Sequence, residues 1–307
     1  MAVPSISTNF PDILDPRFQK VFNDQHRQLP DRVGEFFDIV RNAPTTADLR
    51  FSQVGTLGDI PEFGGAVTYL DNFQGYDVTI TPKEYAGGYQ IERKLYDDDQ
   101  FSVMDGKPRS LATSLNRTRQ KHAASLFVNA FSIDSTWLTH SEGVALCSNS
   151  HTTTSGASTS VGFDNLSTAS LSAVAVSADR TTMRQFRGDQ AERINVMPNT
   201  LLVPIDREDD AYEITQSQGK PDTANNNANA QGGGRWTTKS WEYLDDANDW
   251  FMMDADVMKQ FVKWFERVSS EFAMVEDFDS LIGKWRLYSR YGLGWVDWRW
   301  VLGHQVS

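Results

Sequence analysis

The stretch PRSLATSLNRTRQKHAASLFVNAF, residues 108–131, decides the fold. No Gly or Pro interrupts residues 109–131, and Leu111, Leu115 and Leu126 fall on one stripe. Apolar residues at three- and four-residue spacing are typical of one face of a helix. With a rise of about 1.5 Å per residue, this helix would be about 35 Å long. The stretch therefore predicts a long helix that serves as a spine for the elements around it.

The first fifty residues read as an arm with short helices. Asp15 followed by Pro16 is a typical helix start, and Phe18, Val21 and Phe22 then share a face. Residues 33–40 form a second short apolar stripe. Two short amphipathic pieces bury too little surface to be stable alone, so we expect this arm to pack on something else.

In residues 51–93 the apolar residues recur with a period of two: Tyr76, Val78 and Ile80 alternate with polar side chains. Glycines and prolines are frequent between the alternating segments. This pattern indicates strands that are joined by long extended turns. The polar, Gly-rich segment Gly55–Gly65 is expected to be the tip of a long hairpin.

The chain after the spine mixes helices, strands and polar loops. Residues 148–162 are almost all Ser, Thr, Ala and Gly, and are interpreted as a loop. We expect helices over 167–186 and 206–218, with a short buried strand at 199–203 between them. The Asn- and Gly-rich run at 225–234 is a low-complexity loop.

The C-terminal part is rich in tryptophan, with eight of the nine Trp after residue 235. Asp254 is expected to cap a helix that carries apolar residues as far as Phe272. Two strands should follow, joined at Gly292–Gly294. Trp at strand spacing is more often core than a sugar-stacking platform, so we expect a buried cluster.

The composition excludes several classes of protein. The 307-residue chain carries a net charge of −12 and has no basic cluster, which opposes nucleic-acid binding as its primary function. It contains no run of about 18 apolar residues, so we expect no membrane span. The N-terminus resembles no signal peptide. Apolar residues make up 39%, so we expect part of the apolar surface to be buried against partners.

The search for catalytic and metal sites leaves nothing that points to an enzyme. Phosphate-binding, nucleophile-elbow and zinc-protease motifs are missing from the sequence. Cys147 and His151 lie close together, but in a Ser-rich segment that we expect to be too flexible to orient a nucleophile. Asp97–Asp99 fails the calcium-loop spacing and is interpreted as a solvated turn. We expect no catalytic residue, no cofactor and no metal.

Two local segments carry a family resemblance. GVALCSNSH at Gly143–His151 is similar to a Gly-x-x-Leu-(Phe/Cys)-Ser-x-x-His segment, and MPNTLLVP at Met197–Pro204 is similar to a Pro-x-x-Leu-Val-Pro strand. Both patterns are those of the Mu-like major head subunit family of tailed-bacteriophage major capsid proteins, which the two segments therefore resemble. The order of the predicted elements also resembles that family over nearly the whole chain. Thr152 departs from the family pattern, which has Pro there.

The resemblance implies an α+β phage major-capsid fold. Its expected parts are an N-terminal arm (1–50), an extended β-hairpin loop (51–93), a peripheral domain with the spine helix (94–164), an α/β axial domain (165–253) and a return to the peripheral domain (254–307). The loop would reach over a neighbouring subunit and the Asn-rich loop would lie at the local symmetry axis. The expected inter-subunit contacts are Leu57, Asp59, Ile60, Glu62, Phe63, Asn225, Asn226 and Asn227.

The implied function is that of a non-catalytic head protein, which self-assembles as pentamers and hexamers into the icosahedral shell around phage DNA. The expected location is the virion, after assembly in the host cytoplasm. Expected partners are a separate scaffold protein and a portal, with a decoration protein as an optional addition. The scaffold is expected to be separate because no scaffold-like segment precedes Pro4. DNA would be enclosed without specific binding, and no membrane is involved. The alternatives are an encapsulin-like nanocompartment shell subunit and, less favoured, a soluble carbohydrate-active enzyme.

The resemblance also raises covalent cross-linking, because some capsids of this fold form isopeptide bonds between a loop Lys and an Asn of a neighbour. No lysine lies within 51–82, and Lys83 lies at the predicted base of the loop. Cys147, the single cysteine, could join subunits only in pairs. We therefore expect a shell that is held by noncovalent contacts.

Overall fold

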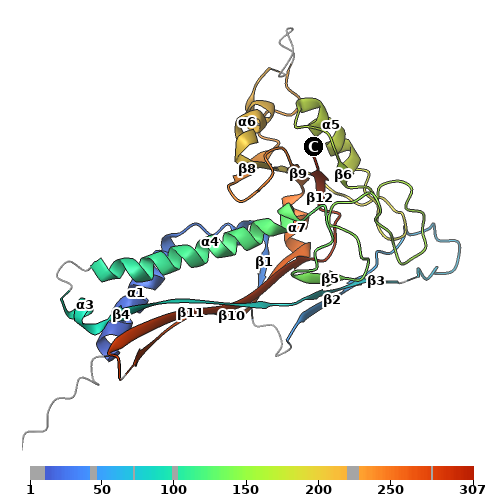
Figure 1. The fold of residues 1–307 in the computed structure, drawn as a ribbon. Coiled ribbons are helices and arrows are strands. Elements are labelled where there is room, and N and C mark those ends of the chain that lie inside the picture. Colours follow the sequence, from blue (N-terminus) through green and yellow to red (C-terminus); the bar gives the residue numbers. More distant parts are fainter. Residues whose placement is uncertain (1–10, 42–46, 72, 99–102, 220–227, 278) are drawn as a thin grey trace, which may run out of the picture.

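The strands of the described residues form three sheets, and a long helix lies along one of them (Figure 1). The computed structural model describes residues 11–41, 47–71, 73–98, 103–219, 228–277 and 279–307. In these residues, no helix has both the length and the apolar character needed to cross a membrane.

The predicted spine is helix α4, Gly106–Val128, which lies along a long sheet (Figure 1). Its buried face includes Leu115 and Phe127. Helix α1, Pro11–Gln28, packs against α4 and the same sheet. Phe22 of α1 stacks on Phe272 with ring centroids 5.1 Å apart, and Phe18 meets Trp285 edge-on at 5.3 Å. The N-terminal helix is therefore docked on its own chain by aromatic contacts.

The long sheet has the strand order β1-β10-β11-β4, in which β1 is parallel to β10 and the other pairs are antiparallel. Its strands are β1 (Asp38–Val40), β10 (Val262–Asp277), β11 (Ile282–Trp295) and β4 (Lys83–Glu92). The short helices α2 (Val33–Phe36), α3 (Arg93–Asp97) and η2 (Val103–Asp105) lie at its connections.

The helix predicted from Asp254 to Phe272 is wrong beyond its first two turns. Helix α7 covers only Ala255–Phe261, and β10 begins at Val262. The pairing of β10 with β11 shifts register between Glu266 and Val268 and again between Val268 and Glu271. Such bulges break the alternation of a strand. Trp264, Val268 and Phe272 lie four residues apart, a spacing that fits a strand as well as a helix, so the apolar spacing alone does not separate the two structures here.

The turn predicted at Gly292–Gly294 is also wrong, because β11 runs through both glycines and the hairpin turns between Asp277 and Ile282. A Cβ atom on Gly292 would lie 3.0 Å from Ile80 Cγ2, and one on Gly294 would lie 3.0 Å from Ile80 Cγ1. These glycines thus permit a neighbouring sheet to approach closely, rather than forming a turn.

That neighbouring sheet has the order β2-β3-β5, with strands β2 (Leu49–Val54), β3 (Gln74–Ile80) and β5 (Leu138–His140). Strands β2 and β3 form the predicted hairpin, with Leu49 opposite Ile80 and Phe51 opposite Val78. Strand β4, which the sequence analysis assigned to the extended loop, pairs with β11 instead. The hairpin therefore ends at Ile80, and residues 83–92 belong to the long sheet.

The third sheet has the order β6-β12-β9-β7-β8. Helix α5 (Ala173–Met183) packs on β9 and β12, whereas α6 (Glu208–Gln216) packs on β7 and β8. The strand predicted at 199–203 and the helix predicted at 206–218 are confirmed within two residues at each end. The helix predicted over 167–186 begins only at Ala173, because Ser167 belongs to strand β6. The bounds of the other elements are β6 (Leu166–Ser167), β7 (Thr200–Pro204), η3 (Ile205–Arg207), β8 (Thr237–Trp241), β9 (Trp250–Met253) and β12 (Val301–His304).

The tryptophans form core, as expected, and not a sugar-stacking platform. Trp241, Trp250, Trp264 and Trp300 are fully buried, and the other five Trp are at most 3% exposed. Trp241 stacks on Phe36 at 4.8 Å, which joins the third sheet to the arm. One continuous apolar cluster connects all three sheets.

Candidate assembly surfaces

The segment between β2 and β3 carries exposed apolar side chains. Leu57 is 54% exposed, Ile60 88% and Phe63 71%, and Val67 and Tyr69 are likewise exposed. Residues 55–71 have no helix or strand in the structure. Contiguous apolar side chains on a protein surface mark sites of contact with partners. This segment, together with β2 and β3, is called the extended loop below.

All five expected contact residues in the extended loop are exposed, namely Leu57, Asp59, Ile60, Glu62 and Phe63. The structure thus places these five of the eight expected contacts on one exposed segment. The other three, Asn225, Asn226 and Asn227, lie outside the described residues.

The base of the extended loop is fixed by hydrogen bonds to the turn at 188–190. The backbone N–H of Thr56 donates to Asp189 Oδ2 at 3.2 Å, and the N–H of Asp189 donates to Thr56 Oγ1 at 2.8 Å. The side-chain amide of Gln190 donates to the carbonyl oxygens of Thr56 and Asp71, at 3.3 and 3.0 Å. Both chain segments at the root of the loop are therefore held, while its apolar tip projects beyond them.

Arg299 supports this base from the core. Its guanidinium donates to Asp189 Oδ1 and to Asp297 Oδ2, both at 2.9 Å, and to the carbonyl of Arg187 at 2.7 Å. The residue is only 6% exposed. Burial lowers the pKa of Arg299, but Asp297 and Asp189 outweigh this effect and the pKa is raised. The two carboxylates thus keep a buried cation charged at the root of the loop.

A second buried network joins the spine helix to the long sheet at the bulge in β10. Glu266 accepts from Arg119 of α4 at 2.7 Å and from Arg41, which follows β1, at 2.9 Å. Burial raises the pKa of Glu266, but Arg119 and Arg41 lower it more, and the net change is downward. The Arg119 guanidinium also lies 5.3 Å from the Trp264 ring centre. The network fixes α4 against two strands of the sheet.

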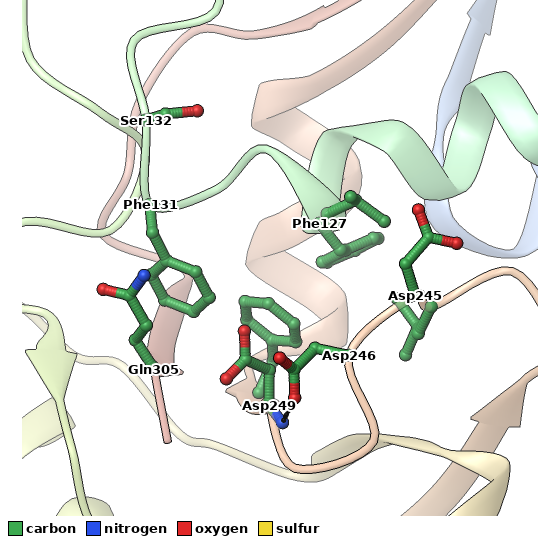
Figure 2. A pocket seen from close by; sticks show the side chains of 10 residues that line it. Phe127, Phe131, Ser132, Asp245, Asp246, Asp249 and Gln305 are labelled. Atoms are coloured by element: carbon green, nitrogen blue, oxygen red, sulfur yellow. Dashed lines mark hydrogen bonds between the residues drawn. The ribbon is translucent and has the colours of Figure 1, made fainter. Parts of the chain in front are cut away.

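A cavity of about 350 Å³ lies where the end of α4 meets the loop before β9 (Figure 2). Phe127 and Phe131 line it from the end of the spine, and Asp246 and Asp249 lie next to each other on the other wall. Burial, with Asp246 adding to it, raises the pKa of Asp249. The lining includes no His, Lys or Cys, and the described residues contain no cluster of metal-ligating side chains. The cavity therefore offers no arrangement for nucleophilic or metal-assisted chemistry.

Cys147 and His151 have structural roles and lie in packed surroundings, not in the flexible segment that the sequence suggested. Cys147 is fully buried, and this burial raises the pKa of its thiol far above the usual range. His151 Nδ1 is hydrogen-bonded to Glu142 Oε1 at 3.1 Å, and the His151 ring stacks on the Trp298 ring with centroids 4.3 Å apart. A buried neutral thiol is a poor nucleophile.

Sequence reasoning missed the residues that fix the extended loop, namely Asp189, Gln190 and Arg299. They are separated from the loop by more than 100 positions. The Asp-x-Arg spacing at 297–299 carries no signal of its own, so only the tertiary structure reveals the group.

A family model described as "Phage capsid protein" matches residues 75–303, which cover the spine, strands β4, β10 and β11 of the long sheet, and the third sheet up to Gly303. No curated protein matches the sequence.

Several solved capsids share the fold at low sequence identity. The capsid of a native GTA particle matches with a TM-score of 0.56 and 12% identity over 91% of each chain. The head of Helicobacter pylori bacteriophage KHP40 matches with a TM-score of 0.56 and 9% identity, over 91% of this chain and 92% of that one. The procapsid of bacteriophage JBD30 matches with a TM-score of 0.53 and 13% identity, over 98% of this chain and 77% of that one.

These matches bear out the expected α+β phage major-capsid fold, and the carbohydrate-active alternative is wrong. The chain belongs to the phage capsid protein family and is a structural, non-enzymatic protein of the virion shell.

Proposed function

We propose that the chain is the major head subunit, which self-assembles as pentamers and hexamers into an icosahedral shell. The observation that carries this proposal is the extended loop, which is fixed at its root by Asp189 and Gln190 and exposes Leu57, Ile60 and Phe63 at its tip. Such apolar side chains gain stability only when a second surface covers them. A neighbouring copy of this chain is that surface, with Asp59 and Glu62 at the rim of the contact.

The proposed domain boundaries follow the family resemblance. Residues 1–50 form the arm, the extended loop reaches over the neighbour, 94–164 and 254–307 form the peripheral domain, and 165–253 form the axial domain. Strand β4 then counts with the peripheral part, because it pairs with β11. Asn225, Asn226 and Asn227 remain predicted contacts at the local symmetry axis.

The remaining partners are proposals of the same kind. The Mu-like major head subunits are the proposed subfamily, on the segments Gly143–His151 and Met197–Pro204. We propose assembly in the host cytoplasm with a separate scaffold protein and a portal, and a decoration protein as an optional addition. The net charge of −12 favours DNA that is enclosed without specific binding, because like charges repel.

Electron microscopy of the purified protein tests this function. Large closed shells support a phage head subunit. Small closed shells of a single size would favour the nanocompartment alternative. A monomer at every protein and salt concentration in analytical ultracentrifugation would overturn the proposal.

A further inference from the structure

Two helices on different strands of the third sheet present surfaces of opposite charge. Helix α6 packs on β7 and β8 at one end of the sheet, and α5 packs on the neighbouring pair β9 and β12. Figure 1 draws α6 and α5 on the two flanks of this part of the molecule.

The α6 surface is acidic around an exposed aromatic ring. Tyr212 is 66% exposed, and Glu208 and Asp209 neighbour it on the helix surface at spacings of four and three residues, while Glu213 is the next residue along the helix. All three acids are exposed, and none forms an ion pair with a described residue. Ile205, just before the helix, is exposed as well.

The α5 surface is hollow and basic. A cavity of about 600 Å³ is bounded by Val174, Ser177, Ala178 and Thr181 of α5 and by residues 228–231. Val174 is 69% exposed at its edge. The four α5 residues follow the spacing i, i+3, i+4 and i+7 of one helix face. Their small side chains leave room for a large one.

Arginines lie at the rim of this cavity. Arg235 is exposed and donates to the carbonyl oxygen of Ala230, one of the lining residues, at 2.6 Å. Arg180 lies on α5 and Arg184 directly follows its last residue, and no ion pair to a carboxylate is formed by Arg180, Arg184 or Arg235 among the described residues. Burial lowers the pKa of Arg180, and Arg235 and Arg184 lower it further. Arg235 and Arg184 thus repel Arg180, and none of the three has an ion-pair partner in the part of the chain that the structure describes.

We propose, resting on the proposed self-assembly, that the α6 surface of one subunit docks on the α5 surface of the next, with Tyr212 in the cavity and Glu208, Asp209 and Glu213 opposite Arg180, Arg184 and Arg235. The occupant is a second copy because the complementary charge and the protruding ring both exist on this chain. A surface that pairs with a different surface of the same protein makes a head-to-tail contact, which forms a ring when the rotation from one subunit to the next closes. Complementary charge gives such a contact its polarity and register.

Charge reversal at the fully exposed positions tests this contact. In the first variant, Arg184→Glu and Arg235→Glu make the α5 surface acidic, like the α6 surface. In the second variant, Asp209→Lys and Glu213→Lys make the α6 surface basic, like the α5 surface. We expect each variant to keep the circular dichroism and melting temperature of the natural protein, but to sediment as a monomer where the natural protein forms pentamers, hexamers or shells. The four-residue swap in one chain has the natural net charge and should restore assembly.

Mixing the two reversed chains gives a sharper result. An acidic chain and a basic chain can only alternate around a ring, and alternation closes only rings with an even number of subunits. We expect native mass spectrometry of the mixture to show hexamers with three copies of each chain and no pentamers.

Reversed variants that assemble like the natural protein, or pentamers in the mixture, would overturn this inference and leave the proposed function intact. A natural protein that stays monomeric would defeat the proposed function itself, and the inference with it.

Discussion

Arg299 and Asp189 form a buried ion pair across the root of the extended loop, with 2.9 Å between Nη2 and Oδ1. Asp189 in turn exchanges two hydrogen bonds with Thr56, the first loop residue after Gly55. The loop is therefore tied through one carboxylate to the cation beside Trp298 in the core. This connection lets a chain with an exposed apolar tip keep that tip in a defined position.

Replacing Arg299 by Ala should destabilise the protein by about 3–5 kcal/mol, because Asp189 and Asp297 would be left as buried charges without a partner. Equilibrium urea denaturation measures this difference. Arg184→Ala, at an exposed arginine of α5, is the control and should change the free energy of unfolding by less than about 0.5 kcal/mol. A loss below about 1 kcal/mol for Arg299→Ala would show that the ion pair does not hold the fold.

Glu266→Gln should cost about 3 kcal/mol at neutral pH, since Arg119 would lose its buried carboxylate. The folded-state pKa of Glu266 lies below its ordinary value of 4.5, so the ionised form is favoured by folding. Its contribution is therefore complete above that ordinary value and disappears as the pH falls through the lower folded value.

Unfolding free energies of the natural protein and the Gln variant, measured from pH 7 to pH 3, test this sign. The two curves should lie apart at pH 7 and converge below pH 4.5. Curves that stay parallel over this range would refute the assignment of a charged Glu266.

Leu57→Ser, Ile60→Ser and Phe63→Ser together should leave the subunit as stable as before, because these side chains are 54–88% exposed. Assembly should fail, since the apolar surface that the neighbour covers is lost. Melting temperature and negative-stain microscopy read out the two effects. The control is a triple Ser variant at exposed Ile133, Val161 and Val275, which lie outside the extended loop and outside the α5 and α6 surfaces, and it should assemble normally. Normal shells from the loop variant would mean that the loop does not carry the contact.

Mature particles boiled in detergent with reductant should run as one band near 34.6 kDa. Lys83, the nearest lysine to the loop, lies in strand β4 with its ammonium 5.2 Å from the Trp137 ring centre. Cys147 is buried. A ladder of dimers through hexamers would contradict a noncovalent shell and would direct attention first to Lys83.

The sequence predicted the elements whose hydrophobic period is uninterrupted. The spine helix, the β2–β3 hairpin, α5, β7 and α6 all appear where the pattern places them, with ends that differ by a few residues. For these elements one face is buried and the local pattern records it directly.

The pattern failed where tertiary contacts interrupt it. In β10, Trp264, Val268 and Phe272 lie four residues apart, which fits a helix as well as a strand, and the bulges around Val268 break the alternation that would mark the strand. Gly292 and Gly294 resemble a turn, but they are glycines because Ile80 packs against their backbone. A single sequence carries no separate sign for either effect.

The residues of the candidate assembly surfaces also differ in whether they could be predicted before the structure. The sequence pattern around Leu57, Ile60 and Phe63 is polar and Gly-rich, and these three residues were expected as contacts through the family resemblance; the structure shows that all three are exposed. The residues that anchor that segment, Asp189 and Arg299, meet only through the fold. The α5 and α6 surfaces also needed the order of strands in the third sheet, which places them on opposite flanks.

Cryo-electron microscopy of particles assembled from this chain shows directly whether the extended loop contacts a neighbouring subunit. We expect closed icosahedral shells in which Leu57, Ile60 and Phe63 of each subunit are buried against a neighbouring copy. Particles in which these three side chains face solvent, or a protein that forms no shell, would contradict it.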